Sequence, residues 1–304
     1  MKILITGALG YIGGECLLRF AQRPDVTVYA VDNDRQAIAA RSSHFAQYSN
    51  INIFECDITD IHQLRKLPSA DLIVHLAAKV GYMESSSDPE LTEFVNVKGT
   101  ANIASLYTPV IFFSTGSVYG KIGTVCNETV TPNPQTVYAE TKLLAERALA
   151  NVDHVVFRPA TAYGVSLKMR HDLIVHDLIK QIVDTAQIDL YQPQAMRSFY
   201  SVQKLAELIE FACDNFALVK NNVYNVGCES GNVTKEKLLD IIGQHCDFDC
   251  DIIPGADADT RDYNVDYTKL AAVWPNYKES FADQIVPVID YYKKPGIELN
   301  DWYF

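Results

Sequence analysis

Three side chains in the middle of the sequence have types and spacing that suit proton transfer. Tyr138 and Lys142 stand four residues apart in a helical pattern, so both lie on one helix face. A free tyrosine has a pKa of about 10, and a neighbouring ammonium lowers it because it favours the phenolate. Thr115, which ends an apolar strand pattern, supplies a hydroxyl to hold a substrate oxygen. Taken alone, the Tyr/Lys pair also fits an ordinary amphipathic helix.

A glycine-rich loop near the start of the chain predicts a dinucleotide site. Gly7, Gly10 and Gly13 follow an apolar strand over residues 3–5 and lead into a helical pattern. Gly7 permits a tight turn, Gly10 lets the backbone approach a pyrophosphate, and Gly13 lets the helix pack closely on the strand. The pyrophosphate is expected at the N-terminus of that helix, where backbone N–H groups lack intrahelical partners.

The end of the second apolar strand indicates which dinucleotide binds. Asp32 closes the run over residues 26–31, about twenty residues past the glycine loop. Its carboxylate suits the ribose hydroxyls of NAD and repels the 2′-phosphate of NADP. Arg35 stands close enough in sequence to pair with such a phosphate, but we interpret it as a solvated residue in a first helical turn. The sequence therefore predicts NAD, with NADP less favoured.

Apolar runs alternate with helical patterns through the first half of the chain. Such alternation predicts a parallel sheet covered by helices on both faces, with ligands at the carboxyl ends of the strands. Strands are expected over residues 3–5, 26–32, 51–58, 71–78, 110–115 and 154–159, and helices over 89–106 and 137–150.

The regular alternation stops near residue 164, which predicts a second and smaller unit. Short β runs over residues 188–191, 223–226 and 250–253 mix there with helical patterns. We expect an α/β fold with two domains. Residues 1–164 form a Rossmann-type doubly wound parallel sheet that binds NAD. Residues 165–304 mainly form an α+β lid that binds the substrate, with one or two segments returning to the first domain.

Charge and composition exclude several classes of partner. The net charge of −12 over 304 residues disfavours nucleic acids and anionic membranes. No run approaches the ~20 apolar residues of a membrane span, and Lys2 leads directly into the glycine-loop strand, so no signal peptide is expected. Seven scattered cysteines suit a reducing cytoplasm. His245, Cys246 and Cys250 lack a second ligand pair, so no metal site is predicted.

Several short blocks occur along the chain in an order that resembles one known family. They are Thr-Gly-Ala-Leu-Gly-Tyr-Ile-Gly at 6–13, Cys-Asp-Ile at 56–58, His-Leu-Ala-Ala at 75–78, Asn-Val-Lys-Gly-Thr at 96–100, Ser-Thr-Gly-Ser-Val-Tyr-Gly at 114–120, Tyr-Ala-Glu-Thr-Lys at 138–142 and Arg-Pro at 158–159. Over nearly its whole length the chain resembles the extended short-chain dehydrogenase/reductase family, in its nucleotide-sugar epimerase/dehydratase branch.

The resemblance implies roles for the matching residues. Tyr138 is implied to be the general acid/base, Lys142 to bind the nicotinamide ribose and tune Tyr138, and Thr115 to take the family's Ser or Thr position. Asn96 is implied to support the active-site helix, and Asp57 to contact adenine. The complete implied set of cofactor contacts is Gly7, Gly10, Tyr11, Ile12, Gly13, Asp32, Asn33, Asp57, Ile58, Leu76, Ala77, Ala78, Lys79, Asn96, Ser114, Tyr138, Lys142, Arg158 and Pro159.

The resemblance also implies where a nucleoside diphosphate sugar binds. Arg197 resembles the family's lid arginine, and Arg261 and Arg170 are further candidates for the positive pocket that an acidic chain needs around a diphosphate. Gly81 and Tyr82 are candidates to shape the sugar pocket.

Two departures from the family pattern limit the substrates and reactions that the resemblance implies. Thr161 replaces the Asn of many sugar epimerases, which speaks against a UDP-hexose substrate. Gly116 and Ser117 replace the acidic pair of the sugar 4,6-dehydratases, which speaks against dehydration.

The resemblance therefore implies an NAD-dependent enzyme that moves a hydride at a sugar carbon, with C4 as the favoured position. A 4-epimerase and a 4-keto-sugar reductase or 4-dehydrogenase both fit. A catalytically silent NAD-binding regulatory protein and a non-sugar dehydrogenase are further alternatives. Apolar faces over residues 96–106 and 138–150 predict a homodimer, since the family pairs these helices.

Overall fold

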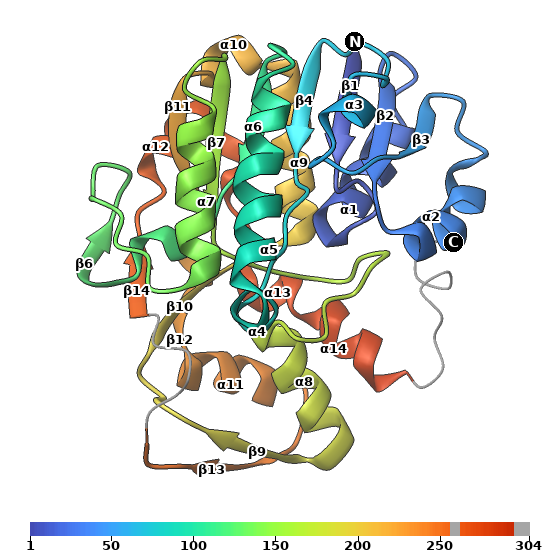
Figure 1. Cartoon of the computed structure of the whole chain (residues 1–304). Coiled ribbons are helices and arrows are strands. Elements are labelled where there is room, and N and C mark those ends of the chain that lie inside the picture. The colour runs from blue at the N-terminus through green and yellow to red at the C-terminus, as the bar shows by residue number, and fades with distance from the viewer. Residues whose placement is uncertain (256–261, 295–304) are drawn as a thin grey trace.

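The computed structural model describes residues 1–255 and 262–294, and a parallel sheet of seven strands forms its centre (Figure 1). The strand order is β11-β7-β5-β4-β1-β2-β3, and each neighbouring pair is parallel. The strands are β1 (Lys2–Thr6), β2 (Thr27–Asp32), β3 (Ile51–Glu55), β4 (Leu72–His75), β5 (Val110–Phe113), β7 (His154–Pro159) and β11 (Asn222–Val226). The predicted doubly wound α/β fold is confirmed.

The order of winding reverses between β1 and β4. The chain builds β1, β2 and β3 towards one edge, then returns to place β4 on the other side of β1. Ligands of such sheets bind in the crevice at this switch point, outside the carboxyl ends of the strands. The glycine loop follows β1, and residues 76–79 follow β4, so both predicted cofactor segments border the crevice.

Both faces of the sheet are apolar because helices cover each of them. Ile3 and Ile5 of β1 belong to one core cluster together with Leu17, whereas Leu4 belongs to another together with Ala145. This alternation follows from the two-residue period of a strand. The first face carries α1 (Tyr11–Ala21) and α9 (Val202–Asp214), and the second carries α6 (Gly99–Ala104) and α7 (Val137–Ala148).

Residues 223–226, a β run from the second half of the chain, return to the central sheet as strand β11. β11 pairs with β7 in parallel register, with Asn222 opposite Val155 and Val226 opposite Pro159. Tyr224 and Val226 bury their side chains in the main core, which explains why the strand joins the sheet as its seventh member. α9 likewise returns from the second half of the chain and packs on α1. The expected boundary at residue 164 stays a prediction.

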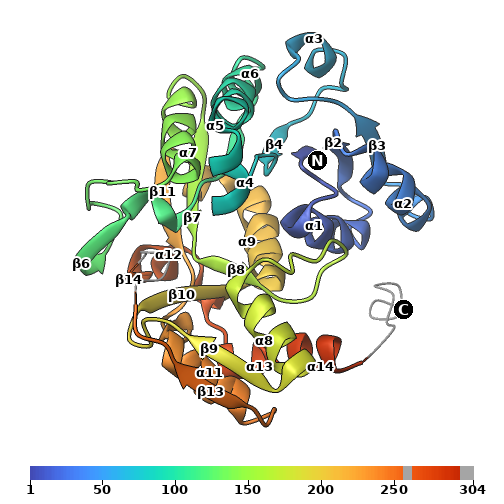
Figure 2. The same cartoon turned by 60° about the horizontal axis from the view of Figure 1, so that its bottom comes forward.

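The remaining lid elements lie beyond the carboxyl ends of the sheet strands (Figures 1 and 2). A three-stranded sheet has the order β12-β10-β8, and β9 pairs with β13. A separate core cluster holds α8, α11, α13 and α14 around Phe199 and Phe281. The bounds are β8 (Thr161–Tyr163), α8 (Ile174–Thr185), β9 (Gln187–Leu190), β10 (Met196–Ser201), β12 (Asn232–Thr234), α11 (Lys235–Gly243), β13 (Asp249–Ile252), α13 (Phe281–Gln284) and α14 (Val286–Lys293).

Shorter elements complete the described part of the chain. They are α2 (Arg35–Phe45), α3 (Ile61–Leu64), α4 (Tyr82–Ser87), α5 (Pro89–Glu93), the π-helix η1 (Phe94–Lys98), the 3₁₀-helix η2 (Gly116–Tyr119), β6 (Lys121–Cys126), α10 (Phe216–Val219), η3 (Glu229–Gly231), β14 (Asp262–Val265), α12 (Thr268–Val273) and η4 (Pro275–Tyr277). β14 pairs with β6 in a two-stranded sheet. Within the described ranges, no helix combines the length and apolarity needed to cross a membrane.

Candidate active site

The loop between β1 and α1 has backbone contacts that only glycine permits. Gly7 has a φ of +66°, and a Cβ atom there would lie 2.8 Å from the backbone of Ala77, which follows β4. A Cβ atom on Gly13 would lie 2.6 Å from the carbonyl oxygen of Ala8. Gly10 is the N-cap of α1 and offers no side-chain cap, so N–H groups of the first turn can receive a phosphate. The loop therefore fits the pyrophosphate of a dinucleotide.

Asp32 is held beside this loop by backbone donors. Its carboxylate accepts hydrogen bonds from the N–H groups of Leu9 at 3.0 Å and Asp34 at 3.1 Å. The Arg35 side chain is 83% exposed and pairs with Glu55 at 2.7 Å. Its guanidinium is thus engaged at the surface, as the sequence interpretation expected. A carboxylate at the position expected for the ribose, with Arg35 paired to Glu55, suits NAD.

Residues after β2 and β3 form the expected adenine side of the crevice. Asp57 accepts hydrogen bonds from the N–H and the hydroxyl of Thr59, both at 2.8 Å. The Asn33 amide approaches the other carboxylate oxygen of Asp57 at 3.5 Å. Ile58 is 5% exposed and packs against Gly99, so its side chain contributes to the core. Contacts of these residues with adenine stay a prediction.

α7 presents Tyr138 and Lys142 one turn apart. Thr136 caps the helix, because its hydroxyl accepts the N–H of Ala139 at 3.1 Å. Tyr138 is half-buried, whereas Lys142 is 2% exposed and places its ammonium 4.2 Å from the centre of the Phe112 ring. Burial lowers the pKa of Lys142 to about 7, although the nearby Glu146 carboxylate opposes the shift.

Thr115 lies on the element that packs against α7. It caps η2, and its hydroxyl oxygen accepts the N–H of Ser117 at 3.1 Å. This bond uses an acceptor site of the hydroxyl, which leaves its hydrogen to be donated to another oxygen. Because η2 contacts α7, the structure brings the segments of Thr115 and Tyr138 together.

Asn96 connects the segment after β4 to the helix that carries Tyr138. It is 1% exposed and lies in the π-helix η1, a distortion that is frequent at functional sites. Its amide oxygen accepts the N–H of Lys79 at 2.8 Å. Its amide nitrogen donates to the Lys79 carbonyl and to the Thr141 hydroxyl, both at 3.0 Å. One side chain therefore fixes both Lys79 and α7.

A buried histidine lies beneath these residues, and its role was not predicted. The Thr6 hydroxyl accepts the N–H of Ala77 at 3.3 Å and lies 2.7 Å from Nδ1 of His75. The Thr100 hydroxyl donates to the Asn96 carbonyl at 2.6 Å and lies 3.0 Å from Nε2 of His75. If Nε2 carries the ring hydrogen, it donates to the Thr100 hydroxyl, and Nδ1 accepts the hydrogen of the Thr6 hydroxyl, so every donor in this network has an acceptor. Burial lowers the pKa of His75 to about 3, so this ring is a neutral bridge.

Arg158 lies in a buried ion pair behind α7. Its guanidinium donates to both carboxylate oxygens of Glu146, at 3.0 and 2.7 Å, and to the Tyr119 hydroxyl at 3.1 Å. The Ser114 hydroxyl donates to the same Glu146. These bonds link β7, which ends at Pro159, to α7. The observed role of Arg158 and Ser114 is to hold that helix, and their contact with NAD stays a prediction.

Two predicted substrate residues lie next to each other. Gly81 caps α4 with a φ of +98°, and a Cβ atom there would lie 3.5 Å from Nη2 of Arg170. Arg170 in turn donates two hydrogen bonds to the Asp172 carboxylate, at 2.7 and 2.6 Å. Tyr82 is the first residue of α4, and its side chain falls outside the described part of the structure.

The other predicted substrate residues belong to the lid. Thr161 on β8 stands opposite Phe199 on β10. Arg197, also on β10, is 3% exposed and donates from Nη1 to the Met196 carbonyl at 3.0 Å. Arg261 lies outside the described residues. The lid sheet thus brings Thr161 and Arg197 onto neighbouring strands.

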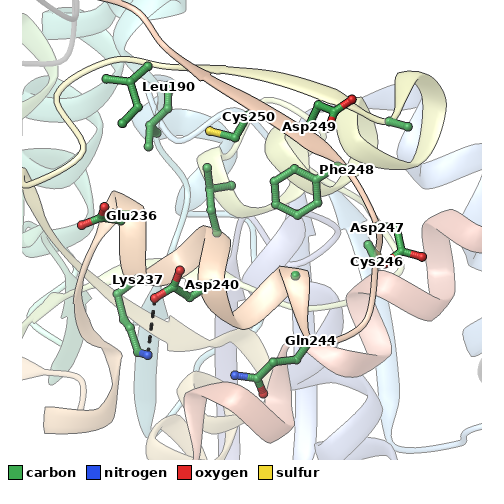
Figure 3. A pocket seen from close by; sticks show the side chains of 14 residues that line it. Leu190, Glu236, Lys237, Asp240, Gln244, Cys246, Asp247, Phe248, Asp249 and Cys250 are labelled. Atoms are coloured by element: carbon green, nitrogen blue, oxygen red, sulfur yellow. Dashed lines mark ion pairs between the residues drawn. The ribbon is translucent and has the colours of Figure 1, made fainter.

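A groove of about 1000 Å³ lies elsewhere in the lid, between α11 and the strands β9 and β13 (Figure 3). Apolar Leu190 and Phe248 share its wall with acidic Asp240 and Asp249. Lys237 pairs with Asp240 at 3.6 Å on α11. The described residues that line it include none of the predicted site residues.

Comparison with known sequences finds a family match and several similar proteins. The model of the NAD dependent epimerase/dehydratase family matches residues 3–227. UDP-glucuronate 4-epimerase 6 of Arabidopsis thaliana is 27% identical over 220 residues, covering 64% of this chain and 46% of that protein. UDP-glucose 4-epimerase of Mycolicibacterium smegmatis is 31% identical over 180 residues, covering 54% and 57%. The matches span about half the length of these curated relatives.

Comparison with solved structures supports the fold. UDP-glucuronic acid 4-epimerase of Bacillus cereus, solved with UDP-glucuronic acid and NAD, has a TM-score of 0.82 at 22% identity, covering 96% of this chain and 99% of that one. UDP-glucose 4-epimerase of Thermotoga maritima, solved with UDP-glucose, has a TM-score of 0.84 at 22% identity with the same coverage. The family match covers well over half of the sequence, and the chain belongs to the NAD dependent epimerase/dehydratase family.

Proposed function

We propose that this chain is an NAD-dependent 4-epimerase of a UDP-linked sugar. The observation that carries the proposal is the position of Tyr138, half-buried and one helical turn before the buried Lys142. The glycine loop and Asp32 supply the NAD site in the same crevice. The curated relatives reported above are named as 4-epimerases of UDP-glucuronate and UDP-glucose, which supports the substrate class.

Each residue of the site has one task in this reaction. The glycine loop and Asp32 would hold NAD, which would supply reversible hydride transfer at C4 of the sugar. Tyr138 receives the proton of the C4 hydroxyl. It returns this proton after the 4-keto sugar has rotated and is reduced on its other face. Lys142 favours the phenolate of Tyr138, and Thr115 donates a hydrogen bond to the sugar oxygen.

The diphosphate of the substrate requires positive charge within a chain of net charge −12. Arg197 in the lid, Arg170 beside Gly81, and Arg261 are the proposed donors, since guanidinium groups form charge-assisted hydrogen bonds with phosphate. Thr161 and Tyr82 are proposed to border the sugar.

Incubation of the purified protein with UDP-glucuronate, and separately with UDP-glucose, tests the proposal. We expect the 4-epimer of at least one of them, separated by chromatography, with no net change in NADH absorbance. A keto sugar formed together with stoichiometric NADH would identify a dehydrogenase instead. Retained NAD without turnover of any nucleotide sugar would contradict an enzymatic role.

We also propose a homodimer built on the helices around α7. Phe94 is 51% exposed and Leu91 is 42% exposed, and both lie on the α5–η1 helix that packs against α7. Large apolar side chains gathered on one exposed helix face are typical of a protein–protein contact. We further propose a cytoplasmic location, since all seven cysteines are free thiols.

A further inference from the structure

A ten-residue segment joins β8 to α8 and crosses the cofactor half of the molecule on its way. Residues 164–173 leave the lid sheet, lie beside α1, and return to α8 (Figure 2). Ser166 and Leu167 are buried, and a Cβ atom on Gly14 in the first turn of α1 would lie 3.4 Å from Cβ of Leu167. We call residues 164–173 the strap.

One imidazole binds the strap at two points. His176, on α8, is fully buried, and its Nε2 accepts the N–H of Gly164 at 3.0 Å. Nδ1 must therefore carry the ring hydrogen, which it donates to the Arg170 carbonyl at 2.8 Å. Burial lowers the pKa of His176 to about 4, so the ring is neutral at physiological pH and keeps one acceptor and one donor. A single side chain thus bridges Gly164 and Arg170, which stand six positions apart in the sequence.

The strap is also tied to the pyrophosphate loop through Tyr11. Tyr11 is the first residue of α1, and its hydroxyl donates to the Gly164 carbonyl at 2.7 Å. The Ser166 hydroxyl donates back to the Tyr11 carbonyl at 2.7 Å. The His176 ring meets the Tyr11 ring edge to face, with centroids 5.9 Å apart. The strap, the N-terminus of α1 and the His176 ring therefore meet in one buried cluster.

Further along, the strap reaches the ribose side of the NAD site. Lys168 pairs with Asp34, two residues after Asp32, at 2.8 Å. Arg41 on α2 donates to the Leu167 carbonyl at 3.1 Å. The strap thus bridges the start of α1 and the segment after β2, which are the two segments expected to hold the pyrophosphate and the adenosine ribose.

We propose that the strap retains bound NAD, and that His176 is the positioning residue that latches it closed. NAD leaves only when the strap lifts from Tyr11 and Asp34, so the strength of the latch sets the rate of release. The same latch holds the backbone carbonyl of Arg170, whose guanidinium lies beside Gly81, and this ties cofactor retention to the sugar end of the crevice. The inference rests on NAD binding by this family and not on the identity of the sugar.

The test measures release of radiolabelled NAD from the loaded protein into excess unlabelled NAD. His176→Leu removes the donor and the acceptor together, and release should become about tenfold faster or more, equivalent to about 1.4 kcal/mol. His176→Gln keeps one amide donor and one amide acceptor at a similar spacing and should release NAD within about threefold of the original rate. Lys180→Ala, on the exposed side of α8, is the matched control and should match the original protein.

Thermal unfolding of the NAD-free variants separates a latch from a merely structural histidine. If His176→Leu loses stability but releases NAD at the original rate, the proposal is overturned. If that variant does not fold, Ser166→Ala removes only the bond to Tyr11 and should speed release several-fold in a folded protein. Unchanged release from Ser166→Ala would then count against the strap. Failure of sugar turnover leaves this measurement unaffected, so the two proposals can fail separately.

Discussion

Burial of Lys142 weakens the folded state while it provides the charge that the phenol of Tyr138 needs. The ammonium lies over the Phe112 ring and is 2% exposed, so little water solvates it. Lys142→Met fills a similar volume without the charge and so removes the cost of desolvating it; replacing buried ion pairs with apolar groups has stabilised some proteins by about 1–4 kcal/mol. We expect the thermal midpoint to rise by at least ~2 °C while epimerisation is lost, as calorimetry and a product assay would show. A lower midpoint would mean that the charge stabilises the fold.

The same burial makes stability depend on pH with a defined sign. The pKa of Lys142 falls from 10.5 to about 7 on folding, so between these values the unfolded chain binds more protons than the folded one. The unfolding free energy therefore gains a contribution that rises as pH increases from about 7. Urea unfolding at several pH values should show this rise in the original protein, and the curve of Lys142→Met should lack it, so that the difference between the two curves isolates the contribution of Lys142.

Single residues differ in how far the sequence reveals them. Tyr138, Lys142 and Gly13 are recognisable because a short spacing or a steric requirement defines each role. His75 is not, because its partners come from distant segments, such as Thr6, 69 residues away. His176 is not either, because its ring bonds to the backbone groups of Gly164 and Arg170, which carry no side-chain signal. Arg158 shows the opposite case, in which a family motif points to the cofactor and the observed partner is Glu146.

The close approach of β1 and α1 can be tested with two adjacent glycines. A methyl group on Gly13 would lie 2.6 Å from the Ala8 carbonyl, whereas on Gly14 the nearest atom would be 3.4 Å away. Gly13→Ala should destabilise the protein by about 1–3 kcal/mol and abolish NAD binding, because the loop must move. Gly14→Ala should be neutral or gain up to about 1 kcal/mol from helix propensity. Equal NAD affinity in both variants would contradict the role given to Gly13.

Elements were predictable where periodicity alone decides them. Six of the seven sheet strands follow from apolar runs bounded by turn residues, although β3, β4 and β5 end earlier than expected. The seventh, β11, has a recognisable strand pattern, but its place depends on parallel pairing with β7 across more than sixty residues. The π-helical turn at η1 has no periodic signature, and the β6–β14 pair joins segments far apart in sequence.

At the scale of the whole molecule, the homodimer proposal depends on the exposed face of α5, η1 and α7. Phe94→Glu places a charge at its centre and should convert the protein to a monomer in light scattering, with its circular dichroism unchanged. Leu218→Glu, on α10 against the other face of the sheet, is the matched control because Leu218 is 54% exposed. A monomeric original protein, or a dimer that survives Phe94→Glu, would count against this interface.

The division of the molecule was only partly readable from the chain. In the first half of the chain, strand and helix patterns alternate regularly and predict the parallel sheet. β11 and α9, in contrast, return to that sheet from the second half, after the lid has begun. Such returns are set by which apolar surface remains uncovered after the first six strands assemble. That surface is a property of the tertiary structure, so local sequence patterns do not record it.

The most direct test of the central claim is Tyr138→Phe, which removes one hydroxyl from a half-buried side chain. Epimerisation of the accepted UDP-sugar should fall about 100-fold or more, since the proton acceptor is gone. NAD content after purification and the thermal midpoint should stay at the original values, because the ring and the NAD site are kept. Epimerisation within about threefold of the original rate, in a folded and NAD-loaded variant, would contradict the account.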